Sequence, residues 1–190
     1  MIVLGSTSKY RAELLTRLGL AFEAARPNCD ETPQIDEKPL DLALRLAKTK
    51  AHSLTTRYPE SIIIGSDQVC ALAGQVLGKP GTVENAVQQL RTMQGQSVIF
   101  YTALSVLNSK TGETQNAVDQ TIATLRNLTE AEIDRYIEAE MPLDCAGSFM
   151  VEKLGISLFE QVESKDPTAL IGLPLISLCK TLRHFGVNVP

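Results

Sequence analysis

The 190-residue sequence is poor in histidine and has no closely spaced pair of cysteines. Its two histidines are His52 and His184, which argues against a histidine-rich zinc site and against a Ser-His-Asp triad. The four cysteines form no C-x-x-C motif; they are Cys29, Cys70, Cys145 and Cys179. Cysteines scattered in this way are typical of reduced, mostly buried thiols, and we therefore expect a cytoplasmic protein.

The sequence also lacks a block of lysine or arginine and a long apolar run. Because its formal net charge is −4, we expect no electrostatic binding to a nucleic acid polymer. No apolar run is long enough to cross a membrane, and the opening stretch MIVLGSTSKYR is too short and too polar for a signal peptide. Such a protein can still bind phosphates through a few cations and a metal ion.

Hydrophobic residues make up 44% of the chain, which is enough for a buried core. The length fits one domain, or two small lobes that share a cleft. Periodicity predicts strands at residues 1–5, 20–25, 61–71, 76–79, 97–108, 114–125 and 155–164. Helices are expected from a cap at Ser6, Thr7 or Ser8 to about 18, at about 40–57, from Thr82 to Gly95, at 129–140 and after Pro174. This alternation indicates a mixed α/β chain, in which ligands tend to bind at strand ends.

The stretch IIIGSDQVC places Asp67 directly after the apolar part of a predicted strand. We expect Asp67 to lie at the end of that strand. A buried and unpaired charge is costly. Either Asp67 caps a turn, or a positively charged group comes to meet it.

The stretch GSTSKYR joins the first predicted strand to the first helix and contains Arg11. Free backbone N–H groups and small hydroxyl residues at a helix start form an anion site, and Arg11 could bind a phosphate with two hydrogen bonds. An ordinary helix cap followed by a surface arginine has the same pattern.

Lys50 lies within the apolar side of the helix expected at 40–57. At about 100° per residue, it falls in the middle of the stripe formed by Ala43, Leu46, Ala47, Ala51 and Leu54. Either the amine extends out of the core to water, or it is directed into a cleft at a negative group.

Two loops add a further cation and two acids. The stretch LGKP presents Lys79 at a strand end, close in sequence to Asp67 across the expected hairpin, although alone it is a common turn. The stretch CDET holds Asp30 and Glu31, whose oxygens suit Mg²⁺ or Mn²⁺, although acidic loops are usually just solvated. Together these groups are typical of metal-assisted attack on a phosphate ester or anhydride.

Seven short motifs, in their order and spacing, resemble the Maf family of nucleoside triphosphate pyrophosphatases. They are GSTSKYR, DETP, RLAKTKA, GSDQV, GKP, CAGSF and GLPL. The resemblance covers residues 2 to about 182 and implies a single domain over 1–190, with a mixed sheet, flanking helices and two lobes around a central cleft, similar to inosine triphosphatases. It further implies hydrolysis of a nucleoside triphosphate to the monophosphate and pyrophosphate, a divalent cation (Mg²⁺, Mn²⁺ or Co²⁺), and often a homodimer.

The resemblance also assigns roles by position. Asp67 matches the family's proton acceptor, and Glu31 matches an acidic, metal-linked position, with Asp67 as the other candidate metal ligand. The phosphate-binding positions of the family are matched by Ser6, Arg11, Lys50 and Lys79.

Three further positions distinguish branches of the family. Many Maf proteins that act on dTTP and UTP have Arg, Thr and Gln where this chain has Tyr10, Gln68 and Glu152, and the chain is similar instead to the branch assigned to 7-methyl-GTP. N7-methylation makes guanine cationic, which an aromatic face and a carboxylate would favour. Alternatively, these residues have no role in binding the base: Tyr10 packs at a helix start and Glu152 is solvated. Two other functions stay open: a pyrophosphatase for another non-standard purine triphosphate, and a nucleotide-binding regulator of septum formation.

Overall fold

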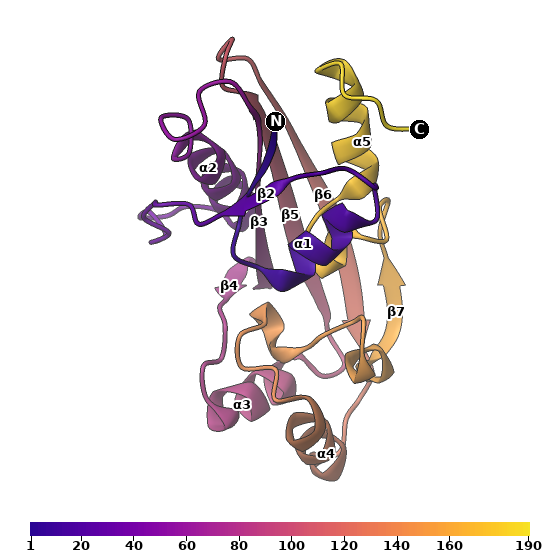
Figure 1. The fold of residues 1–190 in the computed structure, drawn as a ribbon. Coiled ribbons are helices and arrows are strands. Elements are labelled where there is room, and N and C mark those ends of the chain that lie inside the picture. Colours follow the sequence, from indigo (N-terminus) through magenta and orange to yellow (C-terminus); the bar gives the residue numbers. More distant parts are fainter.

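The computed structural model describes all residues, 1–190, as one seven-stranded sheet with helices on both faces (Figure 1). This is the mixed α/β fold expected from the sequence. The strands are β1 (Ile2–Gly5), β2 (Glu23–Ala25), β3 (Ile62–Leu72), β4 (Gln75–Leu77), β5 (Ser97–Asn108), β6 (Thr114–Leu125) and β7 (Phe159–Glu163). The helices are α1 (Lys9–Thr16), α2 (Pro39–His52), α3 (Val83–Met93), α4 (Glu130–Glu140) and α5 (Leu175–His184). None of these helices combines the length and the hydropathy needed to cross a membrane.

The strand order is β2-β1-β3-β5-β6-β7, and β4 pairs with β3. On one edge of β3, β1 runs parallel to Ile62–Gly65 and β4 runs antiparallel to Cys70–Leu72. β5 pairs with β3 along the other edge, from Ile62 to Ala71. Residues 66–69 of β3 therefore have no neighbouring strand on the first edge. This gap between β1 and β4 opens the sheet at one place.

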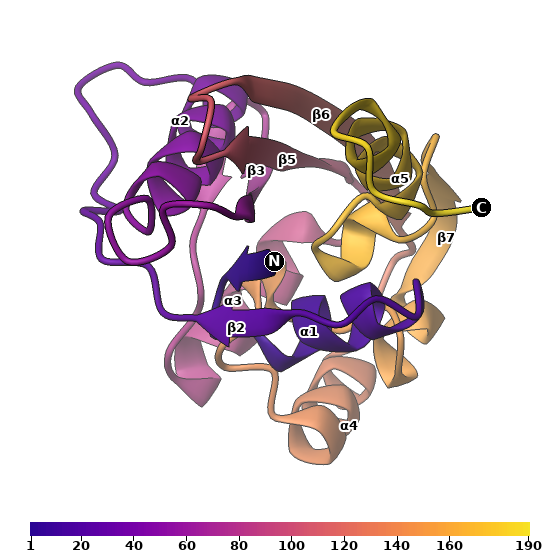
Figure 2. The same ribbon diagram turned by 45° about the horizontal axis from the view of Figure 1, so that its top comes forward.

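Helices α2 and α5 cover opposite faces of the sheet (Figure 2). Because side chains alternate along a strand, Ile63 and Val69 of β3 pack toward α2. Ile64 packs toward α5 instead. Consecutive residues of β3 therefore face opposite sides of the sheet. Within residues 66–69, side chains on both faces lie beside the gap.

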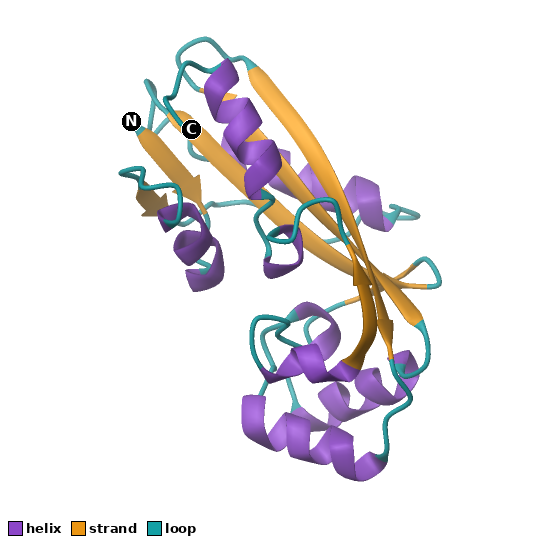
Figure 3. Ribbon diagram, turned by 90° about the vertical axis from the view of Figure 1, so that its right-hand side faces the viewer, coloured by secondary structure: helices purple, strands orange, loops and turns teal.

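The molecule has two lobes joined by the long strands β5 and β6 (Figure 3). The first lobe contains α1, α2 and α5 with β1 and β2. The second lobe contains α3, α4 and residues 141–158, packed around Phe100, Leu125, Ile133 and Phe149. The two lobes have separate apolar clusters, so the space between them is free to form a cleft.

The helix expected at 40–57 is shorter in the structure, where α2 ends at His52. After that residue, the N–H groups of Leu54 and Thr55 donate to carbonyls three residues earlier rather than four. Such bonds tighten the last turn of a helix. The prediction was therefore wrong for the last turn.

The strand expected at 155–164 is extended only in its second half. Residues Leu154–Leu158 form a 3₁₀ helix, and the extended part is β7. A Cβ atom on Gly155 would lie 2.4 Å from the carbonyl oxygen of Met150. The chain therefore turns back closely on itself before it joins the sheet, which an alternating sequence pattern does not reveal.

Candidate active site

Asp67 lies in the middle of β3, at the gap beside the end of β1. The expectation that it ends a strand was wrong, because β5 continues to pair with β3 as far as Ala71. The nearest strand end is that of β1, where Gly5 pairs with Gly65. Asp67 is 7% exposed, so it requires a partner.

The partner of Asp67 is Lys50. Lys50 Nζ lies 2.6 Å from Asp67 Oδ1 and 3.2 Å from Glu31 Oε1. Lys50 is itself 5% exposed, so its amine points into the protein and does not extend to bulk water. Asp67 caps no turn, and its second oxygen, Oδ2, accepts no hydrogen bond from the protein.

Gly65 allows this contact because it lets α2 approach the sheet. A Cβ atom at Gly65 would lie 2.2 Å from the Ala47 carbonyl oxygen and 2.8 Å from the Ala51 nitrogen. The helix backbone therefore packs directly on β3. Lys50 precedes Ala51, so the same approach brings its amine to Asp67.

The start of α1 forms a second part of the site. Ser8 caps the helix, and its Oγ accepts a hydrogen bond from the Arg11 backbone at 3.4 Å. Arg11 Nε donates to the Gly172 carbonyl at 2.9 Å, and Arg11 Nη1 lies 3.5 Å from Ser6 Oγ. Burial lowers the pKa of the Arg11 guanidinium, while the carboxylate of Asp67 acts in the opposite direction. Arg11 is thus held in place by the protein as a fixed cation.

Ser6, Ser8, Arg11 and Lys50 border a polar cavity of about 640 Å³, whereas Asp67 is not among its lining residues and contacts the cavity wall through Lys50. Five of its lining residues are cationic, namely Lys9, Arg11, Arg26, Lys50 and Lys79. Only two are acidic, Glu31 and Asp144. In a chain of net charge −4, this concentration of positive charge favours an anionic ligand with several charges.

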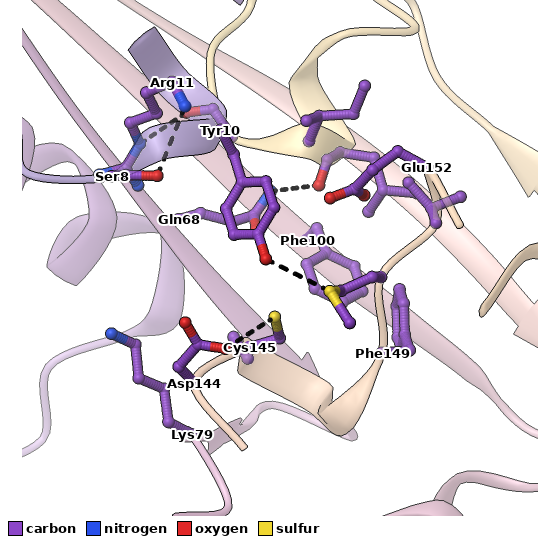
Figure 4. Close-up of a pocket in the computed structure, with 16 residues that line it drawn as sticks. Ser8, Tyr10, Arg11, Gln68, Lys79, Phe100, Asp144, Cys145, Phe149 and Glu152 are labelled. Atoms are coloured by element: carbon purple, nitrogen blue, oxygen red, sulfur yellow. Dashed lines mark hydrogen bonds between the residues drawn. The ribbon is translucent and has the colours of Figure 1, made fainter. Parts of the chain in front are cut away.

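A smaller cavity of about 160 Å³ adjoins the polar one. Figure 4 shows the residues that line this smaller cavity. The rings of Tyr10, Phe100 and Phe149 line it, together with the polar side chains of Gln68 and Glu152. Because Ser8, Tyr10, Arg11, Lys79 and Asp144 line both cavities, the two form one cleft. We call the larger part the polar cavity and the smaller part the ring cavity.

Gln68 is fixed at the wall of the ring cavity. Its Nε2 lies 3.0 Å from Thr102 Oγ1 and from the carbonyl oxygens of Ala169 and Leu170. Its Oε1 accepts no hydrogen bond and remains available as an acceptor.

Tyr10 spans the cleft from the first lobe to the second, where its hydroxyl donates to Met150 Sδ at 3.3 Å. Burial raises the pKa of the Tyr10 phenol, and the negative charges of nearby acids, including Asp144 and Glu152, add to this shift.

The structure brings most of the predicted residues to the cleft. Ser6, Glu31, Arg11, Lys50 and Lys79 line the polar cavity, and Tyr10, Gln68 and Glu152 line the ring cavity.

Lys79 lines the polar cavity and makes no hydrogen bond or ion pair with Asp67. It forms no ion pair, because β4 ends at Leu77 and residues 78–80 leave the sheet. Asp30 does not line the cleft either, since its Oδ1 accepts from the Thr32 N–H within the loop.

Several residues that line the cleft have no role in the predictions from sequence, among them Arg26, Phe149 and Asp144. Arg26 lines the polar cavity, Phe149 the ring cavity, and Asp144 both. A signal existed for two of them, because Asp144 precedes the motif CAGSF and Phe149 ends it. Arg26 begins a polar loop without a recognisable motif, so no signal in the sequence indicated its role.

Two carboxylates could contribute to a divalent metal site. The chain contains no group of three or more His, Cys, Asp or Glu residues placed to hold a metal ion. Glu31 and Asp67 nevertheless converge on one positive charge, that of Lys50. Mg²⁺ is often bound by one or two carboxylates together with substrate phosphates, so this donor set fits a metal ion shared with a phosphate ligand.

The fold and the cleft define a mixed α/β protein in which a cationic cavity continues into an aromatic one. The family model described as Maf-like protein matches residues 1–185. The chain belongs to the Maf family.

Two curated relatives are similar over nearly the whole length. A protein of Cupriavidus metallidurans named 7-methyl-GTP pyrophosphatase is 54% identical over 185 residues, which cover 97% of this chain and 93% of the relative. A protein of Vibrio vulnificus with the same name is 50% identical over 188 residues, covering 99% and 96%. Among solved structures, the Staphylococcus aureus Ham1 protein shares the fold, with a TM-score of 0.54 and 14% identity over 97% of this chain and 98% of that one.

Proposed function

We propose that the chain hydrolyses a nucleoside triphosphate to the monophosphate and pyrophosphate, with 7-methyl-GTP as the preferred substrate. The observation that carries this proposal is the continuity of the cleft, because a cationic cavity beside a ring cavity matches a triphosphate joined to a base. The names of the two curated relatives support the same activity.

The polar cavity would bind the triphosphate. Arg11, Lys50 and Lys79 carry positive charge there, and Ser6 lies at the start of α1. Cations held in place before the reaction stabilise negative charge that develops on phosphate oxygens. Arg11 in particular is oriented by its bond to Gly172.

Asp67 is the proton acceptor in this proposal. Its Oδ1 is bonded to Lys50, whereas Oδ2 has no partner in the protein and is available to accept a proton from water. Lys50 therefore orients the carboxylate as well as contributing positive charge. The water oxygen becomes part of one product when the α–β anhydride bond breaks.

Glu31 and Asp67 are the residues that would hold a divalent cation. When bound, the cation would neutralise phosphate charge and orient the anhydride. Lys50 lies between the two carboxylates and keeps them close together when no divalent cation is bound.

The ring cavity would bind the 7-methylguanine base. A cationic ring is attracted to the face of Tyr10 and to the carboxylate of Glu152, which lie on different lobes. The free Oε1 of Gln68 offers an acceptor for N–H groups on the edge of guanine.

A panel of nucleotides tests the proposal. The purified chain is incubated with 7-methyl-GTP, GTP, ITP, dTTP or UTP and with Mg²⁺, Mn²⁺, Co²⁺ or EDTA, and pyrophosphate and monophosphate are quantified. We expect pyrophosphate and 7-methyl-GMP in equal amounts, and no turnover in EDTA. A higher kcat/KM for ITP would contradict the substrate assignment. Tight nucleotide binding without pyrophosphate release would contradict hydrolysis and favour a nucleotide-binding regulator.

We also place this activity in the cytoplasm, a proposal that the four free cysteines support. The homodimer implied by the family resemblance stays a prediction.

A further inference from the structure

The two cavities meet at a junction lined by Ser8, Tyr10, Arg11, Lys79 and Asp144. Asp144 is the only carboxylate among these residues. Its side chain accepts one long hydrogen bond, 3.5 Å, from the weak donor Cys145 Sγ. Asp144 forms no ion pair, so its oxygens are available to a ligand.

The backbone fixes the position of Asp144. On one side, the Leu143 carbonyl accepts from the Gly81 N–H at 3.0 Å. On the other side, Gly147 has a φ of +74° and packs so closely that a Cβ there would lie 3.2 Å from Cys70 Sγ. The segment is therefore held against β3, and the carboxylate is presented at the junction with the Cys145 thiol as its one hydrogen-bond donor. Asp144 and Lys79 lie across the cleft from Ser8 and Arg11 (Figure 4).

The order of groups in a nucleotide determines what reaches the junction. A sugar joins the base to the triphosphate, so a ligand with its base in the ring cavity and its phosphates in the polar cavity has its sugar between them. Ribose carries hydroxyl groups at C2′ and C3′ that donate hydrogen bonds, and an ionised carboxylate only accepts them. A carboxylate is the common partner of the ribose 2′-hydroxyl in dinucleotide-binding folds.

We infer that Asp144 accepts a hydrogen bond from the ribose 2′-hydroxyl and makes the enzyme select ribonucleotides over 2′-deoxyribonucleotides. This inference rests on the proposed function, because it requires a nucleoside triphosphate in the cleft. It assigns to Asp144 a role in sugar specificity, separate from the base-binding role of Tyr10, Gln68 and Glu152.

The test compares 7-methyl-GTP with its 2′-deoxy analogue at saturating metal. For the unaltered chain we expect kcat/KM to be about 10- to 100-fold higher for the ribonucleotide, the range for one hydrogen bond to a charged group. Asp144→Ala is expected to lower kcat/KM for the ribonucleotide and leave the deoxyribonucleotide unchanged, so that the ratio approaches one. Asp144→Asn keeps a neutral acceptor and the side-chain shape. We expect its ratio of kcat/KM for the two nucleotides to lie between that of the unaltered chain and that of Asp144→Ala.

Asp134→Ala is the matched control, since Asp134 is an exposed carboxylate on α4 that does not line the cleft. Its ratio should equal that of the unaltered chain. Equal rates on both nucleotides before mutation, or an equal loss on both in Asp144→Ala, would overturn the inference and leave the proposed function intact. Release of pyrophosphate from neither nucleotide by the unaltered chain would overturn both. If Asp144→Ala fails to fold, the Asp144→Asn ratio decides the question alone.

Discussion

In the pair formed by Lys50 and Asp67, each buried charge compensates the other. Their side chains are 7% and 10% exposed, so each charge depends on the other for compensation. Attraction within a buried ion pair is opposed by the cost of removing both ions from water. The pair is therefore sensitive to loss of either partner, but the two losses differ because Lys50 also contacts Glu31.

Asp67→Asn should abolish turnover and preserve the fold. The amide oxygen can still accept the hydrogen bond of Lys50, whereas the neutral group is a poor proton acceptor. We expect kcat to fall by at least about 10²- to 10⁴-fold, measured as pyrophosphate release, with an unaltered circular dichroism spectrum. Asp134→Asn is the control. Turnover by Asp67→Asn at the rate of the unaltered chain would disprove the assignment of the base.

Lys50→Met should destabilise the protein more than Asp67→Asn does. It leaves Asp67 buried without its cation, at a cost of about 3 kcal/mol, while Asp67→Asn leaves Lys50 with Glu31 as partner. Urea denaturation of both variants measures the difference in unfolding free energy. Lys48→Met, on another side of α2, controls for the change in helix composition. A larger loss in Asp67→Asn would show that the pair does not stabilise the fold as described.

At the level of secondary-structure elements, the approach of α2 to β3 produces this contact. Gly65→Ala should separate the two elements, because the added Cβ would lie 2.2 Å from a helix carbonyl oxygen. We expect a loss of about 1–3 kcal/mol or more in stability and a lower kcat as Lys50 moves away from Asp67. Thermal melting and pyrophosphate release measure the two effects. Gly78→Ala is the matched control, since a Cβ there would meet no atom within 4 Å. Equal behaviour of the two variants would contradict the role of Gly65.

A second contact between elements holds the loop that carries Glu31. Arg45 on α2 binds both oxygens of Glu37, at 2.6 and 2.8 Å, and donates to the Thr32 carbonyl at 3.0 Å. These hydrogen bonds lower the pKa of Glu37 from 4.5 to about 2. The loop is thereby attached to the same helix that provides Lys50.

The depressed pKa of Glu37 predicts a pH dependence. A carboxyl group that releases its proton more readily in the folded state stabilises that state above its unfolded pKa of 4.5, and this stabilisation is lost as the pH falls toward about 2. The melting temperature of Glu37→Gln should therefore be lower than that of the unaltered chain at pH 7, and the difference should shrink below about pH 4.5. Glu138→Gln, on the exposed side of α4, should show no such trend. A difference that does not change between pH 7 and pH 3 would contradict this account.

Over the whole molecule, the ring cavity, which is the proposed base site, is lined by residues of both lobes. Tyr10 belongs to α1 in the first lobe, Gln68 to the gap in β3, and Glu152 to the second lobe. The bond from Tyr10 to Met150 connects the lobes across this site. In the proposed function, specificity for the base would therefore depend on the relative position of the lobes as well as on the three side chains.

Changing Tyr10 to Arg, Gln68 to Thr and Glu152 to Gln together should move activity toward pyrimidine triphosphates. The triple variant loses an aromatic face and a carboxylate and gains a cation, which disfavours a cationic base. We expect the ratio of kcat/KM for 7-methyl-GTP to that for dTTP to fall about 10-fold or more. Glu160→Gln, an exposed change on β7, is the control. An unchanged substrate ranking would count against all three assignments.

Local patterns in the sequence were sufficient for most elements. The bounds expected at 97–108 and 114–125 match those of β5 and β6, and the helix expected at 129–140 is α4, which begins with a capping box formed by Thr129 and Glu132. Alternation of side chains and caps within one turn of helix depend on neighbouring residues, so they can be inferred from the order of the chain. The strand expected at 155–164 was wrong in its first half, where Gly155 packs on the backbone of Met150 in a tight turn that side-chain alternation does not report.

The sequence alone was sufficient to infer the family and the α/β character of this protein. It also identified most of the charged and aromatic side chains that are candidates for the site. Which of them meet was decided only in three dimensions. Lys50 reaches Asp67 because β1 stops and Gly65 admits α2, and Asp144 reaches the junction because Gly147 packs on β3. Sheet register and the distance between packed backbones depend on the whole chain at once, and no local pattern encodes them.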